Sequence, residues 1–215
     1  ASQQRTATAQ AQGFFTHEII PVSIAQRKGD PIVVDTDEHP RASTTLEGLA
    51  KLKPVVTAEG TVTAGNASGI NDGAAAVLIA SEQAIEEYQL KPRAKIIAST
   101  AVGIDPRIMG FAPAPAIKKL LKQANLSIEQ MDVIELNEAF AAQALAVTRD
   151  LGLADDTTQV NPNGGAIAIG HPLGASGARL VTTALNQLEQ TGGTYALCSM
   201  CIGVGQGIAM IIQRV

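Results

Sequence analysis

Cysteine is scarce in this sequence, and its scarcity excludes several kinds of protein. Only Cys198 and Cys201 occur among the 215 residues, spaced as C-x-x-C. No second pair accompanies them, and no helix is predicted directly after Cys198, so the spacing argues against a zinc site, a structural disulfide and a thioredoxin-like redox motif. We therefore expect no bound metal.

Clustered positive charge is missing as well. Lys and Arg number 16 against 20 Asp and Glu, which gives a formal net charge of −4, and no basic stripe is present. Because nucleic acids and anionic membrane surfaces are bound through clustered Lys and Arg, both are excluded as partners. No apolar run reaches the roughly 18 residues of a transmembrane helix, so we expect a cytoplasmic protein.

An initiator methionine is also lacking. The chain begins Ala-Ser-Gln-Gln and continues into a polar, helix-compatible segment. Such a start is expected of a piece processed or cut from a longer protein, in which any targeting signal would lie upstream. What is present suffices for a globular fold, because 46% of the residues are hydrophobic in a chain long enough to bury a sizeable core.

Two parts of the chain differ in pattern. Up to about Ser68 there is little periodicity, whereas strand-like and helix-like patterns alternate beyond it, and the apolar run 74–80 has the composition of a buried segment. The predicted strands are 94–102, 133–136, 195–200 and 207–212, and the predicted helices are 81–90, 115–124, 140–151 and 180–191. This alternation, which ends in an antiparallel pair, predicts an α/β fold with a mixed sheet and helices on both faces.

Asn137 stands where the predicted strand 133–136 gives way to a helix. Asn is among the preferred residues that cap a helix N-terminus, so one interpretation is purely structural. The other is chemical, because a side-chain amide at the end of a strand can hold a water molecule in a site. From this stretch alone both interpretations stay open.

One of the three histidines lies in a glycine-rich stretch, NPNGGAIAIGHPLGASGAR, residues 161–179. His171 is flanked by Gly170 and Pro172, and glycine permits unusual backbone angles and leaves room for a ligand beside the imidazole. This placement suits a general base; the alternative is a core histidine satisfied by backbone groups. The stretch lacks the Gly-Lys-Ser/Thr ending of a phosphate-binding loop, so a nucleotide site is not indicated.

Cys201 follows the predicted strand 195–200 and opens the turn GVGQG, residues 203–207. At such a position a thiol can be exposed, and backbone N–H groups can converge on developing negative charge. The alternative is that Cys201, like Cys198 inside the strand, is a small apolar filler. The turn is only superficially similar to a dinucleotide loop: no helix follows it, and no acidic residue stands about 20 positions beyond a strand, glycine loop and helix, so an NAD-dependent oxidoreductase is not favoured.

Four segments together resemble the thiolases: TAGNASGINDGAAA at 63–76, LNEAFAAQ at 136–143, the stretch 161–179 quoted above, and CSMCIGVGQG at 198–207. Each segment alone allows a plain structural interpretation, including a simple loop at 64–73. Their joint order and spacing carry the resemblance, which extends along essentially the entire chain. It suits acetyl-CoA acetyltransferases, 3-ketoacyl-CoA thiolases and 3-oxoadipyl-CoA thiolases alike.

The resemblance implies a layered α/β/α fold built of two related halves, with a loop domain that covers coenzyme A. This chain looks like the rear of the loop domain, residues 1–68, followed by the C-terminal domain, residues 69–215. The half with the family's nucleophilic cysteine would be missing, so neither Cys198 nor Cys201 is assigned that role. The chain by itself is then expected to be inactive, to bind coenzyme A or only associate structurally, and to self-associate through the apolar face that the halves share.

The implied reaction is the reversible Claisen condensation of an acyl-CoA with acetyl-CoA, or the thiolytic cleavage of a 3-ketoacyl-CoA, through a cysteine acyl-enzyme. By resemblance, His171 activates the missing thiol and, with a water held by Asn137, polarises the thioester oxygen. Cys201 would move the proton at the α-carbon of the second substrate. The N–H of Gly203 would contribute to an oxyanion hole.

Ala64, Ser68 and Phe140 match positions that line the pantetheine channel of the family. The implied ligands are coenzyme A, acetyl-CoA and a 3-ketoacyl-CoA, all as substrates, with no covalently bound cofactor. The implied setting is fatty acid metabolism. The implied partners are the missing N-terminal half and further copies of the protein in a dimer or tetramer, and the length of the acyl chain stays open.

Overall fold

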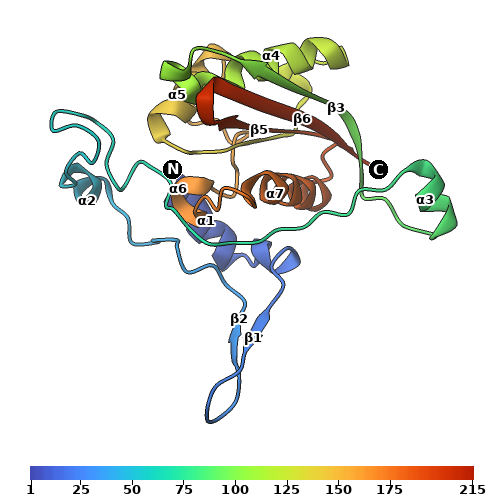
Figure 1. Ribbon diagram of the computed structural model, residues 1–215, viewed down its shortest axis with the longest axis horizontal. Helices are drawn as coiled ribbons and strands as arrows, with labels where there is room; N and C mark the ends of the chain where they lie inside the picture. The colour runs from blue at the N-terminus through green and yellow to red at the C-terminus, as the bar shows by residue number, and fades with distance from the viewer.

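A four-stranded mixed sheet forms the centre of the computed structural model, which describes residues 1–215 (Figure 1). The strands lie in the order β3-β6-β5-β4; β4 is parallel to β5, and the other neighbours are antiparallel. They are β3 (Ala94–Gly103), β4 (Val133–Leu136), β5 (Tyr195–Ile202) and β6 (Gln206–Arg214). Each one overlaps a predicted strand, so the prediction of a mixed sheet is confirmed.

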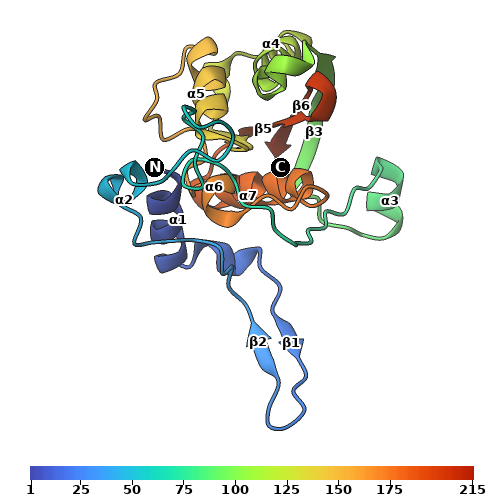
Figure 2. The same cartoon turned by 60° about the vertical axis from the view of Figure 1, so that its left-hand side comes forward.

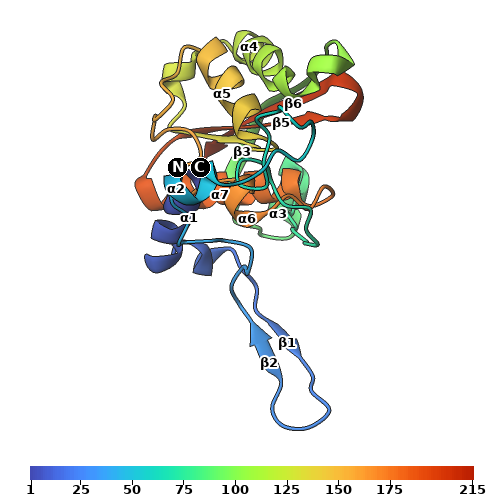
Figure 3. The same cartoon turned by 90° about the vertical axis from the view of Figure 1, so that its left-hand side faces the viewer.

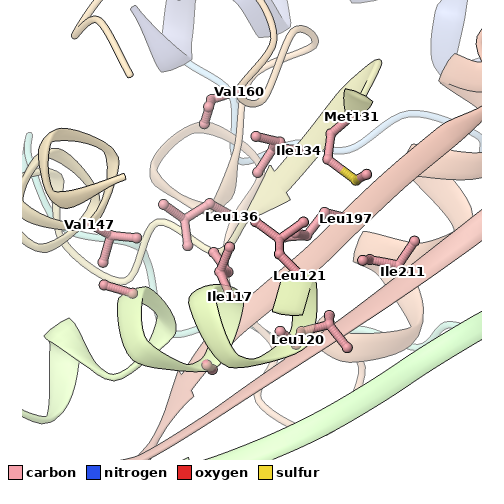
Figure 4. Close-up of a cluster of buried hydrophobic side chains, with 13 residues drawn as sticks. Ile117, Leu120, Leu121, Met131, Ile134, Leu136, Val147, Val160, Leu197 and Ile211 are labelled. Carbon is pink, nitrogen blue, oxygen red and sulfur yellow. The ribbon is translucent and has the colours of Figure 1, made fainter. Parts of the chain in front are cut away.

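Helices cover both faces of this sheet. On one face lie α4 (Pro113–Ala124) and α5 (Ala141–Asp150), and on the other lies α7 (Ser176–Thr191) (Figure 1). Thirteen buried apolar residues join α4 and α5 to the sheet, with Ile117 and Leu120 of α4 beside Leu136, Leu197 and Ile211 (Figure 4). The result is a layered α/β/α arrangement.

The opposite layer follows the pattern that the sequence predicts. Leu180, Ala184 and Leu188 recur at helical spacing on α7 and are buried in a second apolar cluster against the sheet. Gly192 then ends α7 in the left-handed conformation, with φ of 74°, which glycine adopts without steric cost. An apolar-lined cavity of about 530 Å³ remains between α7 and the sheet.

Short helical turns complete the sheet-and-helix body. They are η2 (Pro106–Phe111), η3 (Ile128–Gln130), α6 (Ala166–Ile169) and η4 (Gly203–Gly205). The predicted capping box is present at η3, where the backbone N–H of Ser127 donates to Gln130 Oε1 over 2.8 Å. None of the helices has both the length and the apolar character needed to cross a bilayer.

The front of the chain holds more regular structure than its weak periodicity indicates. Its elements are α1 (Ser2–Ala11), η1 (Phe14–His17), β1 (Val22–Ile24), β2 (Ile32–Val34) and α2 (Leu46–Ala50). β1 and β2 form an antiparallel hairpin that projects away from the body (Figures 2 and 3). The signal was two β-branched runs on either side of a turn that contains Gly29, whose φ is 87°.

Residues 74–80 contradict the prediction of a buried segment. They run extended past α7 to α3 (Glu82–Glu87), pair with no strand, and leave Leu78 83% exposed (Figure 1). The composition of this run suits a buried segment, but the run can be buried only where other parts of the protein pack over it, as a neighbouring strand would. The prediction is therefore wrong. In this chain no strand pairs with residues 74–80.

Candidate active site

Asn137 lies directly after β4, at the carboxyl end of the only parallel strand pair. Its backbone N–H donates to Ser199 O on β5 over 2.9 Å, which extends the pairing of Leu136 with Ser199 by one step. The side chain is fully buried, and its Oδ1 has no hydrogen-bond partner within the protein. The N-cap of α5 is Phe140, so the interpretation of Asn137 as a helix cap is wrong.

His171 reaches Asn137 across 34 positions of sequence. Its Nε2 lies 3.2 Å from Asn137 Nδ2, and its Nδ1 lies 2.6 Å from Ser176 Oγ. Both ring nitrogens therefore contact side chains, and the alternative of a histidine satisfied by backbone groups does not hold. The imidazole is half-buried and lies beside Asn137, at the end of β4.

The backbone of His171 is held by the segment that precedes residue 74. Its N–H is 3.2 Å from Gly69 O and 3.3 Å from Asn71 Oδ1, so one donor is shared between two acceptors. Gly170 has a φ of 92°, and a Cβ at this position would collide with the side chain of Asn71. Glycine is therefore required at residue 170 for both its backbone angle and its size.

Burial controls the protonation of the site. Partial burial lowers the pKa of His171 below its usual value, and the nearby Arg179 guanidinium lowers it further. Arg179 in turn donates to the fully buried Glu135 over 2.9 Å, and burial raises the pKa of Glu135 to about 7. The imidazole is thus kept neutral at neutral pH, with one ring nitrogen able to accept a proton.

Cys201 lies near the end of β5, two residues beyond Ser199, on the strand next to β4. It is only 6% exposed, so the expectation of an exposed thiol is wrong, and burial raises its pKa. In the sheet, Cys201 is the register partner of Gly207 of β6. No side-chain hydrogen bond joins Cys201 to His171 or Asn137, so the convergence of all three on one substrate stays a prediction. Cys198 is buried in the α7 cluster, as expected of an apolar filler.

Gly203 begins η4, immediately after β5, and is exposed. No atom lies within 4 Å of the position where a Cβ would be, so the space beside its backbone is open. Gly205 in the same turn has a φ of 85° and packs against the backbone of Ile104 and Pro106. The turn therefore has one packed side and one side that a ligand can approach.

The residues expected along the pantetheine channel lie beside the start of α5. The backbone N–H of Ser68 donates to Ala139 O over 2.9 Å, and Ala67 forms a bridge with Phe140. Phe140 is 39% exposed, and Ala64 is exposed three residues before Ala67. The structure thus brings Ser68 and Phe140 together from segments far apart in the sequence.

Asn161 is a residue that sequence reasoning missed. Its side-chain Oδ1 accepts from the backbone N–H of Leu136, and its Nδ2 donates to the carbonyl oxygen of Leu136, both over 2.8 Å. Nδ2 also donates to Glu138 Oε1 over 3.1 Å. It has a φ of 46°, which asparagine tolerates better than most residues. The available signal was an asparagine just before Pro162 and two glycines, typical of a constrained turn.

Comparison with known proteins identifies the family to which these motifs belong. The family model "Thiolase, C-terminal domain" matches residues 90–214, and "Thiolase, N-terminal domain" matches residues 1–83. The chain belongs to the thiolase family. The resemblance drawn from the four sequence segments is therefore confirmed, while the domain boundary between residues 68 and 69 stays a prediction.

Relatives of this thiolase-family chain are similar to it along its whole length. Over 214 residues it is 84% identical to the beta-ketoadipyl-CoA thiolase of Acinetobacter baylyi and 59% identical to the 3-oxoadipyl-CoA/3-oxo-5,6-dehydrosuberyl-CoA thiolase of Escherichia coli. Each match covers 100% of this chain and 53% of the relative. The chain therefore spans about half the length of the curated relatives it matches.

Solved structures show the thiolase fold directly. An acetyl-CoA acetyltransferase of Bacillus anthracis superimposes with a TM-score of 0.94 at 43% identity, covering 100% of this chain and 54% of its own. A human mitochondrial 3-ketoacyl-CoA thiolase in complex with CoA gives a TM-score of 0.89 at 46% identity, covering 100% and 52%. The layered α/β/α architecture is the fold that the resemblance implied.

Proposed function

We propose that this chain supplies an imidazole, an amide and a thiol to the acyl-transfer site of a thiolase. The observation that carries the proposal is the 3.2 Å contact between His171 Nε2 and Asn137 Nδ2, at the end of a buried strand in a chain of the thiolase family. The nucleophilic cysteine would come from a part of the protein outside these 215 residues. The substrates would be coenzyme A thioesters.

His171 acts in this proposal as the base that activates the nucleophile. A histidine whose pKa is lowered stays neutral at neutral pH, so its ring can take the proton of a thiol. The thiolate then attacks the 3-oxo carbon of the substrate, the C2–C3 bond breaks, and an acyl-enzyme forms. The unpartnered Oδ1 and the Nδ2 of Asn137 give a water molecule two polar atoms to bind beside the reacting oxygen.

Cys201 supplies the proton that the cleavage step consumes. When the C2–C3 bond breaks, its electron pair stays on C2 of the departing acetyl-CoA and must be protonated there. Because burial raises the pKa of Cys201, the thiol keeps its proton at neutral pH and can donate it. Coenzyme A then takes the acyl group from the nucleophile, and the proton of its thiol goes to the Cys201 thiolate. The released nucleophile takes back the proton that His171 holds. In the condensation direction each step runs in reverse.

Backbone and channel residues would bind the parts of the substrate that do not react. The open side of the η4 turn lets the N–H of Gly203 approach a developing oxyanion. Ser68, Ala64 and Phe140, beside the start of α5, would line the path of the narrow pantetheine arm. These assignments rest on the family resemblance and on the open space that the structure leaves at these positions.

The names of the relatives support a substrate class. The Acinetobacter baylyi protein, 84% identical, is named for beta-ketoadipyl-CoA, whereas an acetyl-CoA acetyltransferase of Allochromatium vinosum is 52% identical. We therefore propose a 3-oxoacyl-CoA that carries a free carboxylate at the far end of its acyl chain. A chain of this polarity would enter the site with its charged end held away from the reacting carbon.

A chimera tests the proposed function, because the nucleophile lies outside this chain. The chain would replace the matching 214 residues of the Acinetobacter baylyi relative. We expect this chimera to cleave 3-oxoadipyl-CoA with coenzyme A faster than it cleaves acetoacetyl-CoA. His171→Ala should lower kcat/KM by about 10²- to 10⁴-fold, the usual contribution of an acid–base residue.

Controls make the result decisive. Thr182→Ala, on α7 and away from His171, should leave kcat/KM unchanged, and the 215-residue chain alone should show no thiolysis. A folded chimera that cleaves neither substrate, or His171→Ala at full activity, would refute the proposal. Faster cleavage of acetoacetyl-CoA would refute the dicarboxylic substrate alone.

The partners we propose are further copies of the protein and the rest of the thiolase, in the cytoplasm. The apolar cavity of about 530 Å³ beside α7 and the exposed side chains of residues 74–80 offer an uncovered apolar face. We expect the 215-residue chain to self-associate through it. Sedimentation should therefore show species larger than a monomer, and a strictly monomeric chain would contradict this expectation.

A further inference from the structure

Ser176 is a buried hydroxyl that touches the imidazole of His171. Its Oγ lies 2.6 Å from His171 Nδ1 and 3.0 Å from the carbonyl oxygen of Pro172, and the residue is 1% exposed. The sequence pattern indicates no role for this serine, and the proposed reaction does not use it. Its position at the first residue of α7 ties the imidazole to the start of a long, well-packed helix.

Counting protons fixes the direction of the two contacts. A serine hydroxyl has one proton, and a backbone carbonyl can only accept. If the proton points to Pro172 O, then Oγ accepts from an N–H at His171 Nδ1, and both contacts are hydrogen bonds. If the proton pointed to Nδ1 instead, the two oxygens would face each other at 3.0 Å with no proton between them. The first arrangement is the one that satisfies both contacts.

The other side of the ring gives the same answer independently. Nδ2 of Asn137 is a donor, and it lies 3.2 Å from His171 Nε2, so Nε2 has to be the acceptor and carry the lone pair. A neutral imidazole carries only one N–H, which is then on Nδ1. Two residues from different elements, Ser176 of α7 and Asn137 after β4, thus select one tautomer.

We infer that Ser176 is a positioning residue that holds the ring proton of His171 on Nδ1 and so keeps the lone pair, which can take a proton, on Nε2. What Nε2 does chemically rests on the proposed function; the tautomer itself does not. When His171 becomes an imidazolium, its Nδ1–H still donates to Ser176 Oγ. Only the bond from Asn137 Nδ2 to Nε2 is released, because a protonated Nε2 has no lone pair to accept it. This is the role of an orienting partner in an acid–base site.

Long-range proton–nitrogen NMR of the 215-residue chain tests the tautomer without any activity. His171 should show a protonated Nδ1 and an unprotonated Nε2 at a pH where the ring is neutral. Ser176→Ala should shift the ring toward a mixture of both tautomers. Ser176→Thr, which keeps the hydroxyl, should restore the Nδ1–H form.

The matched control is Thr182→Ala. The Thr182 hydroxyl donates to Ala178 O over 3.0 Å, four residues back on the same helix, as Ser176 does to Pro172, but it does not contact His171. It should leave the His171 signals unchanged. A proton on Nε2 in the unaltered chain, or a Ser176→Ala spectrum identical to it, would overturn the inference, and the first result needs no variant to fold.

A kinetic measurement in the chimera separates this inference from the proposed function. Ser176→Ala should lower kcat by about 10- to 100-fold, the usual cost of losing the partner that orients a histidine, with KM little changed. Ser176→Thr should recover most of the loss. An inactive chimera whose spectra change as expected would refute the proposed function and support the tautomer, whereas an active chimera indifferent to Ser176→Ala would refute the positioning role.

Discussion

The body of the molecule, residues 94–214, and the front segment, residues 1–80, are held in place by different forces. In the body, apolar side chains from four strands and three helices form two clusters, one on each face of the sheet. In the front, the only apolar cluster has three buried residues, and many large apolar side chains are exposed, among them Ile20, Val33 and Val56. Burial of apolar surface therefore stabilises the body far more than the front.

Polar contacts attach the front to the body. The guanidinium of Arg5 donates to the carbonyls of Val160 and Thr157 at 2.6 and 2.8 Å, and Thr6 Oγ1 donates to Asn163 O over 3.1 Å. His39 Nδ1 lies 2.8 Å from Ala168 O. All of these acceptors are backbone groups of the stretch that leads to His171. The front thus holds the backbone of the loop that precedes His171.

The largest expected effect falls on the buried ion pair inside the body. Glu135→Ala would leave Arg179, whose side chain is 18% exposed, without its carboxylate partner. Breaking such a pair costs about 3–5 kcal/mol, and denaturant unfolding should show this loss above about pH 7, where the carboxyl is ionised. Asp155→Asn in the exposed pair with Arg149 is the control and should leave the midpoint nearly unchanged. Equal effects would contradict the distinction between the two pairs.

The same carboxyl makes the stability of the body depend on pH. Its pKa is 4.5 in the unfolded chain and rises to about 7 on burial, so the folded state keeps a proton that the unfolded state releases. The contribution of this carboxyl to the free energy of unfolding is therefore complete below about pH 4.5 and is lost as the pH rises toward 7. Glu135→Gln cannot release a proton and should flatten this part of the pH–stability curve. An unchanged curve would show that another group controls it.

A pair of apolar truncations compares the two regions directly. Leu120→Ala removes a fully buried side chain of α4 and should lower the free energy of unfolding by about 2–5 kcal/mol. Val33→Ala, in the hairpin where the side chain is 55% exposed, should change it by less than about 0.5 kcal/mol. Denaturant midpoints measure both. A large loss from Val33→Ala would mean that the hairpin is covered in solution.

The smallest effect is expected where the front meets the body. Arg5→Ala should cost about 1.5–3 kcal/mol locally, because charged donors to backbone carbonyls are lost. The loss should appear as faster amide hydrogen exchange in α1 and in residues 157–163, with little change in the global midpoint. Arg27→Ala, in the exposed hairpin turn, is the control and should change neither. A fall in the global midpoint would show that front and body unfold together.

The sequence predicted the body well because its signals are local. Apolar residues at helical spacing predicted the buried face of α7, Gly192 predicted its end, and Ser127 with Gln130 predicted the capping box. The glycines around His171 predicted a constrained loop, and Gly170 does adopt a positive φ. Each of these features depends on residues within a few positions of one another.

Features that depend on distant partners could not be predicted this way. The run 74–80 is apolar, yet its burial depends on a sheet that this chain does not provide. Cys201 lies near the end of a strand, where a thiol can be exposed, but in the folded chain it is buried. The roles of Asn161 and Ser176 became visible only when their contacts with Leu136 and His171 were known.

By itself the sequence determined the family and the order of strands and helices in the body, and it supplied the candidate site residues, because motifs and periodicity are written in the chain. Only the tertiary structure decided which of these residues meet. The parallel pairing of β4 with β5 places Asn137 at the sheet edge, and polar contacts from the front segment hold the loop that precedes His171. Contacts across tens of residues arise from packing, and packing is a property of the whole fold.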